Sequence, residues 1–96
     1  MKFKLDLFAE LSEPVKLYPG QSRSINTGVR ASVPEGAVGL VILCRSLSNR
    51  GLELIPTVLR IEEDAREEII LKLINSNDRG SAPTRIEPGD LLAHLI

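Results

Sequence analysis

The stretch INTGVRASVPEGAVGLVILCRSLSNRGLEL, residues 25–54, combines two apolar-rich runs with a turn and a polar cluster. The first run, Arg23 to Val33, ends at the turn sequence Pro34-Glu35-Gly36, and the second runs from Ala37 to Leu43. Short β-branched runs bounded by Pro, Gly and Asn are typical of strands. The stretch therefore predicts two strands, the second of which ends in the polar cluster CRSLSNRG, residues 44–51.

The rest of the chain repeats this pattern on both sides. Lys2 to Leu7 alternates polar and apolar residues, which is the period of a strand with one buried face. Turn signals recur about every ten residues, as in sandwiches and barrels. We expect an all-β fold of about seven or eight short strands. The remaining expected strands are 15–18, 52–55, 58–61, 69–74 and 91–96.

The segment 61–73 also fits a helix. Ile61, Ala65, Ile69 and Leu73 are four residues apart, and no Gly or Pro interrupts them. Its second half, from Ile69 onward, fits a strand equally well. The sequence of residues 61–68 is therefore compatible with a hairpin, a loop or a helical turn.

Composition restricts the architecture. The 96 residues make a single domain, 1–96, and they are 43% hydrophobic but only 3% aromatic, without Trp. The core must therefore consist of Val, Ile, Leu and Ala, and its small volume favours oligomerisation.

Charge and cysteine content restrict the setting and the partners. The formal net charge of −1 argues against direct nucleic-acid binding, which depends on phosphate attraction. A single cysteine, Cys44, forms no internal disulfide, and no apolar run reaches the ~20 residues that cross a bilayer. We expect a cytoplasmic protein with no membrane partner.

The order of the motifs along the chain resembles the trimeric dUTPase family, to which the dCTP deaminases are related. The most specific matches are Thr27-Gly28, Val33-Pro34-Glu35-Gly36, Arg45-Ser46, Arg50-Gly51-Leu52 and Pro88-Gly89-Asp90. The resemblance implies a jelly-roll-like β-clip, an antiparallel barrel that assembles as a homotrimer. It also implies nucleotide sites at the subunit interfaces.

The polar cluster is the first candidate binding site. Arg45 and Ser46 match a family pair that contacts the nucleotide triphosphate, and a guanidinium offers a planar fork of donors to phosphate oxygens. The loop is one residue shorter than in the family, so either Leu47 or Ser48 takes the next role. A strand-ending turn whose polar groups face water is the alternative. The expected cradle comprises Arg45, Ser46, Ser48, Asn49 and Arg50.

The acidic segment is the candidate catalytic site. The resemblance places Glu62 at the carboxylate that positions a water, and Asp64 at a second family aspartate. Ala65 stands where the family has a tyrosine that packs on deoxyribose, and Leu59 and Glu67 replace flanking glycines. A methyl group cannot exclude a ribose hydroxyl as a ring does. The alternative is a solvated acidic face.

Near the end of the chain, His94 occupies the place of a family glutamine that reaches the phosphates, and we expect it either to bind ligand or to fill space at the surface. The sequence ends at Ile96, before the family's Gly-rich arm, so the resemblance implies a protein without a lid. Water exclusion by closure would then be lost.

These observations favour a catalytically degenerate dUTPase-like homotrimer, such as a phage accessory protein, that binds or sequesters a nucleotide or nucleotide-derived signal. One alternative is a minimal active dUTP diphosphatase that uses Glu62, with Mg²⁺ bridging the phosphates. Another is a structural or protein-binding trimer without nucleotide, in which Arg45 and Arg50 pair with Glu62, Glu63 or Asp64 of another subunit. One Cys and one His make no metal site, and we expect no resident cofactor.

Overall fold

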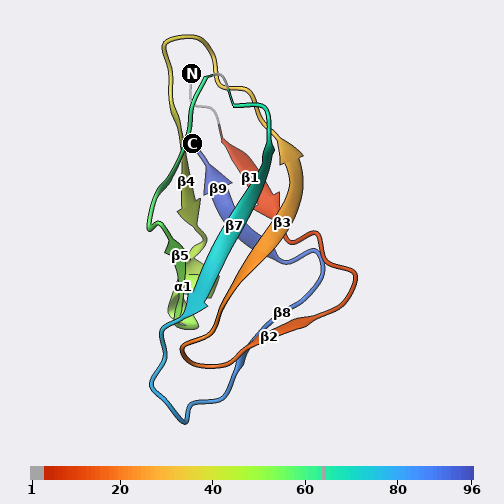
Figure 1. Cartoon of the computed structure of the whole chain (residues 1–96), viewed down its shortest axis with the longest axis vertical. Coiled ribbons are helices and arrows are strands. Elements are labelled where there is room, and N and C mark those ends of the chain that lie inside the picture. Colours follow the sequence, from red (N-terminus) through yellow and green to blue (C-terminus); the bar gives the residue numbers. More distant parts are fainter. Residues whose placement is uncertain (1–3, 64) are drawn as a thin grey trace.

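The computed structural model describes residues 4–63 and 65–96. Nine strands and one short helix are formed within these ranges, so the prediction of an all-β fold is confirmed (Figure 1). In order, the elements are β1 Leu5–Phe8, β2 Val15–Leu17, β3 Ser22–Arg30, β4 Gly39–Leu43, α1 Arg45–Asn49, β5 Leu52–Ile55, β6 Leu59–Ile61, β7 Glu68–Asn75, β8 Thr84–Ile86 and β9 Leu91–Leu95.

The strands form two sheets and a ribbon. One sheet has the order β1-β9-β4-β6 and the other β3-β7-β5, while β2 and β8 pair alone. The two larger sheets lie one behind the other, and the β2–β8 ribbon extends from one end of the molecule (Figure 1). All strand pairs among the described residues are antiparallel.

The core lies between the two larger sheets and follows from the period of two. On β7, Ile69, Leu71 and Leu73 point inward and are buried, whereas Ile70 and Lys72 point outward. Within the described part of the chain, the buried apolar side chains are those of Leu, Ile, Val, Ala and Cys44. For the described residues, the expectation of a core built from Val, Ile, Leu and Ala is therefore confirmed, with Cys44 as an addition.

The structure resolves the ambiguity of 61–73 in favour of strands. β6 ends at Ile61, the Ala65 amide closes a turn by donating to the Glu62 carbonyl at 3.1 Å, and β7 begins at Glu68. Two partner strands satisfy both backbone edges of β7 and bury one of its faces. Tertiary pairing thus overrides the helical spacing.

Three other expectations differ from the structure. The polar cluster 44–51, expected as a loop, contains the single helical turn α1. β3 ends at Arg30 rather than at Val33. β8 was not predicted, because Thr84-Arg85-Ile86 contains only one apolar residue and shows no alternation; its pairing with β2 buries Thr84 and Ile86. Residues 2 and 3 of the first expected strand lie outside the described residues.

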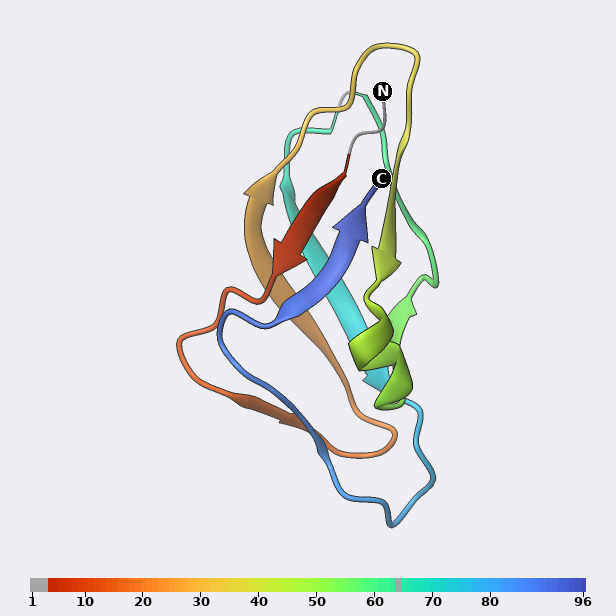
Figure 2. The same cartoon turned by 180° about the vertical axis from the view of Figure 1, so that it is seen from behind.

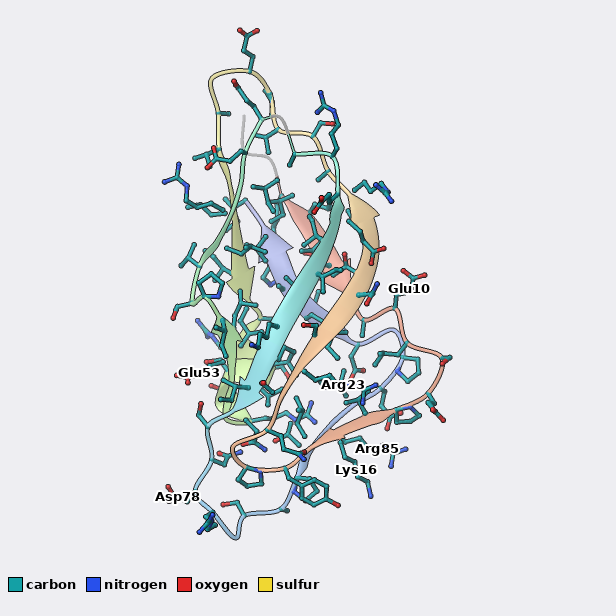
Figure 3. The ribbon with its side chains drawn as sticks, in the orientation of Figure 1. Glu10, Lys16, Arg23, Glu53, Asp78 and Arg85 are labelled. Carbon is teal, nitrogen blue, oxygen red and sulfur yellow. The ribbon has the colours of Figure 1, made fainter. Side chains whose placement is uncertain are left out.

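The β2–β8 ribbon places two like charges directly opposite each other. Lys16 of β2 is the register partner of Arg85 of β8, and both side chains point to solvent (Figure 3). Like charges in this arrangement weaken a strand pair. Glu87 forms an ion pair with Arg85 and offsets part of this repulsion.

The side-chain amide of Asn75 joins three parts of the fold. It is fully buried at the end of β7, and its Nδ2 donates to the Leu17 carbonyl of β2 at 2.7 Å and to Thr84 Oγ1 of β8 at 3.5 Å. Its Oδ1 accepts from the Asn77 amide at 2.9 Å. The ribbon is thereby fixed to the central strand of the second sheet.

The same network holds the turn that follows α1. The Arg50 carbonyl accepts from Asn77 Nδ2 at 3.0 Å and from Thr84 Oγ1 at 3.2 Å. Gly51 has a φ of 85°, and a Cβ at this position would overlap the Asn77 side-chain amide. The positive φ therefore favours glycine here, and a larger residue would also displace the Asn77 side chain from the Arg50 carbonyl. No helix in the described ranges is long and apolar enough to cross a membrane.

We predict that Asn75→Ala lowers the free energy of unfolding by about 2 to 3 kcal/mol, because it leaves the buried Leu17 carbonyl and Asn77 amide without partners. Urea denaturation monitored by circular dichroism measures this change. The control is Asn26→Ala on β3, whose side chain is exposed and which should change the value by less than about 0.5 kcal/mol. Equal effects of the two substitutions would contradict the role of Asn75.

Candidate functional site

A pocket of about 400 Å³ lies beside α1, where the helical turn meets the start of β9. It brings together four of the residues predicted from the sequence, namely Arg45, Ser46, Arg50 and His94. The complete lining is Cys44, Arg45, Ser46, Leu47, Arg50, Asp90, Leu91 and His94. We call this the α1 pocket.

Packing of α1 against the core positions the first two of these residues. Leu47 is 2% exposed and anchors the helical turn, and the Cys44 amide donates to the Leu92 carbonyl of β9 at 2.8 Å. With Leu47 turned inward, Arg45 and Ser46 are exposed. The single buried side chain of α1 therefore orients its polar residues.

The two arginines differ in their partners. The Arg50 guanidinium donates to the Arg85 carbonyl of β8, so this side chain is bound to the fold. Within the described ranges, no protein group forms a hydrogen bond or ion pair with the Arg45 side chain. Arg45 is thus the cation whose donors are available to a ligand in the α1 pocket.

Two acidic groups lie at the α1 pocket, Asp90 in its lining and Asp6 beside His94. Asp90 Oδ2 accepts from the Glu87 amide at 2.8 Å and closes the turn before β9. His94 Nδ1 lies 2.8 Å from Asp6 Oδ1 on β1. Asp6 is not recognisable as a site residue in the sequence, because the contact joins residues 88 positions apart and requires the pairing of β1 with β9.

The structure does not bring the other predicted cradle residues into this pocket. Ser48 borders a different hollow of about 240 Å³, together with Leu43, Leu52 and Thr57 among others. Asn49 is exposed at the end of α1 and lines neither hollow. The orientation of the helical turn explains this separation, since only some of its residues can face one side.

The candidate catalytic residues lie at the other end of β4. Gly39, the first residue of β4, pairs with Ile61, so Glu62 follows that end, whereas Arg45 follows the last residue of β4. Five residues at ~3.4 Å each place these ends about 15 Å apart. Figure 1 shows α1 at the lower end of β4 and the green chain that follows β5 running to the opposite end. Within one chain, Arg45 and Glu62 therefore cannot contact the same phosphate.

The acidic groups at this far end have partners in the chain. Glu62 Oε1 lies 3.4 Å from Arg60 Nε, and both side chains are more than half exposed. Glu63 accepts a hydrogen bond from the Gly36 amide at 2.6 Å. Asp64, the second predicted aspartate, lies outside the described residues.

A second pocket, of about 560 Å³, adjoins this segment. Its lining contains Ala65, Leu59 and Glu67, which the resemblance matches to the family's tyrosine and glycines. Ile61, Arg66, Glu68, Ile69 and Ile70 complete it. A methyl group on this wall leaves space that an aromatic ring would fill.

No three His, Cys, Asp or Glu side chains in the described ranges are grouped to hold a metal ion.

The chain is similar to dUTPases in sequence. The deoxyuridine 5'-triphosphate nucleotidohydrolase of Desulfitobacterium hafniense is 35% identical over 94 residues, which cover 96% of this chain and 60% of that protein. The enzyme of the same name from Chlamydia pneumoniae is 39% identical over 93 residues, covering 95% of this chain and 61% of that protein. The chain thus spans about three fifths of the length of these curated relatives. No family model matches it.

Solved dUTPase structures have the same fold. A mutant dUTPase of Staphylococcus bacteriophage 80alpha superposes with a TM-score of 0.79 at 22% identity, covering 95% of this chain and 72% of that one. The Streptococcus mutans dUTPase superposes with a TM-score of 0.77 at 22% identity, covering 95% and 73%. The expected dUTPase-like fold is therefore confirmed.

We predict that Arg45→Ala weakens binding of inorganic triphosphate by roughly ten- to a hundredfold, because it removes a charge-assisted contact in the α1 pocket. Isothermal titration calorimetry measures the affinity, and thermal melting of the ligand-free protein should barely change. Arg79→Ala, in the loop before β8, is the control for loss of one positive charge at another site.

A lowered melting temperature with unchanged triphosphate affinity would instead make Arg45 an interface ion-pair residue, since its loss would leave a carboxylate unpaired. Arg50 is close enough to compensate for Arg45, so the double substitution Arg45→Ala with Arg50→Ala is measured as well.

Proposed function

The chain belongs to the dUTPase family, and we propose that it binds a nucleotide through its phosphates in the α1 pocket. The observation that carries this proposal is the convergence of Arg45, Ser46, Arg50 and His94 on one pocket from two separate segments of the chain. Guanidinium, hydroxyl and imidazole groups are donors suited to phosphate oxygens.

The proposed binding species is a homotrimer with nucleotide sites at its subunit interfaces. Arg45 and Glu62 lie at opposite ends of β4, so they can reach one ligand together only if a second copy supplies one of them. The outward face of the β1-β9-β4-β6 sheet supports association, because Leu40, Ile42 and Ile96 are each more than a third exposed. Burial of such side chains between copies would add to a core that is small in each chain.

We propose that this trimer retains the nucleotide with little or no hydrolysis. Glu62 is ion-paired with Arg60 at the surface, and a glutamate carries its carboxylate one methylene further from the backbone than an aspartate. A shift of ~1 Å in a reacting group can cost ~100-fold in rate. The space beside Ala65 would admit a ligand larger than deoxyuridine or one that carries a ribose hydroxyl.

An active dUTP diphosphatase is the second candidate, favoured by the names of the curated relatives. In that case Glu62 positions the attacking water at the α-phosphate. Mg²⁺ would be held chiefly by the triphosphate, as is usual for this ion, together with one or two carboxylates.

We predict that the protein shows no dUTP turnover above background, because the carboxylate at position 62 is displaced and ion-paired. A coupled pyrophosphate-release assay with Mg²⁺ measures the rate. The variant Glu62→Asp, which shortens the side chain to that of an aspartate, tests whether geometry limits the reaction and should raise any residual rate. A kcat in the range of ~1 to 10³ s⁻¹ that is common for enzymes would establish the active alternative.

We predict a trimer in solution, because each chain exposes apolar residues on a sheet face and holds only part of the proposed site. Size-exclusion chromatography with light scattering at micromolar concentration measures the mass. Ile42→Glu should dissociate the assembly, whereas Lys72→Glu, on the exposed face of β7 in the other sheet, is the control for an added negative charge away from the proposed interface. A stable monomer or dimer of the unmodified protein would contradict the proposed intersubunit sites.

A further inference from the structure

The pairing of β1 with β9 sets an aspartate against the histidine of the α1 pocket. Asp6 is the register partner of His94, and Asp6 Oδ1 lies 2.8 Å from His94 Nδ1. Figure 2 shows β1 and β9 side by side on the face of the molecule that also carries α1. The imidazole is held on one side by β1 and borders the pocket on the other.

The ring has two nitrogens, and the structure engages only one of them. Nδ1 faces the carboxylate, which accepts hydrogen bonds only, so Nδ1 carries the hydrogen in this contact. For the remaining nitrogen, Nε2, the described residues provide no hydrogen-bond partner. The His94 side chain is 25% exposed and lines the α1 pocket, which leaves Nε2 as the nitrogen that a ligand can reach.

We propose that Asp6 is a positioning residue for His94 in the α1 pocket, and that binding of a phosphate-bearing ligand there is coupled to uptake of a proton by Nε2. With Nδ1–H directed to Asp6, neutral His94 presents a lone pair to the pocket, and a lone pair repels phosphate oxygens. Protonated His94 presents an N–H donor instead, and the negative charge of Asp6 balances the added positive charge. The inference rests on the proposed function, since it assigns a role within the same site.

The other charged groups around His94 have opposite effects on the protonation of its ring. Arg45 and Arg50 oppose a further positive charge in the pocket, whereas Asp6 and Asp90 favour it. The Cys44 thiol donates to the Leu91 carbonyl at 3.3 Å, and Ile42, the partner of His94 on β4, is neutral. A bound di- or triphosphate adds negative charge on the side that Asp6 does not occupy. Protonation of Nε2 and ligand binding therefore reinforce each other, and the affinity should rise as the pH falls.

The first test uses the ligand-free protein. The sequence contains one histidine, so its ring signals in a long-range ¹H–¹⁵N spectrum are assigned without ambiguity. At about pH 8, where histidine is ordinarily neutral, we expect the tautomer with hydrogen on Nδ1. Asp6→Asn should shift the spectrum toward the other tautomer, whereas Glu35→Gln should not, because Glu35 is exposed in the turn between β3 and β4. Hydrogen on Nε2 in the unmodified protein would overturn the proposal.

The second test measures proton uptake. Pyrophosphate is titrated calorimetrically near pH 7 in two buffers that differ in ionisation enthalpy, so that the difference in heat reports protons taken up. We expect uptake by the unmodified protein and by Glu35→Gln, and reduced uptake with an affinity lower by about three- to tenfold for Asp6→Asn. His94→Gln retains a donor without a titrating ring, and its residual uptake measures protonation of pyrophosphate itself.

The outcomes separate this inference from the proposed function. Absence of pyrophosphate binding to the unmodified protein would overturn both the proposed function and the proton coupling. Normal binding with the same proton uptake in Asp6→Asn and in the unmodified protein would overturn the inference alone. Asp6 is partly exposed, so its replacement by asparagine should leave the fold intact, and both measurements on the unmodified protein stand without any variant.

Discussion

The buried side-chain amide of Asn75 is the contact on which the arrangement of the site depends. A buried amide that lacks partners is costly, so its position is stable only when the Leu17 carbonyl and the Asn77 amide are both in place. The backbone of Asn75 also pairs with the chain after β2, since its carbonyl accepts from the Gly20 amide at 2.8 Å. Through Asn77 and Thr84 the same network reaches the Arg50 carbonyl and fixes the end of α1. The position of α1, and with it the α1 pocket, therefore depends on the hydrogen bonds at the end of β7.

The sequence predicted the strands that have one buried face, because such strands alternate apolar and polar residues. Strands β3, β4 and β7 were recognised because each is long enough for its alternating or apolar pattern to be visible. β8 was not, because its three residues include only one apolar side chain, Ile86, and so show no alternation; they form a strand through pairing with β2. The helical turn α1 depends on the burial of Leu47 and on the glycine that follows it, and neither produces a periodic signal.

The residues of the candidate site were likewise predicted only in part. The polar cluster together with the family resemblance indicated Arg45, Ser46 and Arg50, and the resemblance indicated His94; the structure gathers these four around one pocket. The direction of a single helical turn, which places Ser48 elsewhere, is not encoded in residue type. Asp6 lacked any signal in the sequence, since an aspartate on an alternating strand is typical of an exposed face. Only the register between β1 and β9 brings it to His94.

Charge in the α1 pocket is balanced rather than concentrated. Arg45 and Arg50 contribute two positive charges to the lining and Asp90 one negative charge, and Asp6 adds a second negative charge beside His94, so the pocket has no strong net attraction for anions at a distance. Recognition of a phosphate must then depend on which charged side chains already have hydrogen-bond partners within the protein. Asp90 accepts from the turn before β9, Asp6 from His94, and the Arg50 guanidinium donates to β8, while the donors of Arg45 remain available. A phosphate entering this pocket meets the unengaged cation first, because the carboxylates that would repel it are already directed toward donors of the fold.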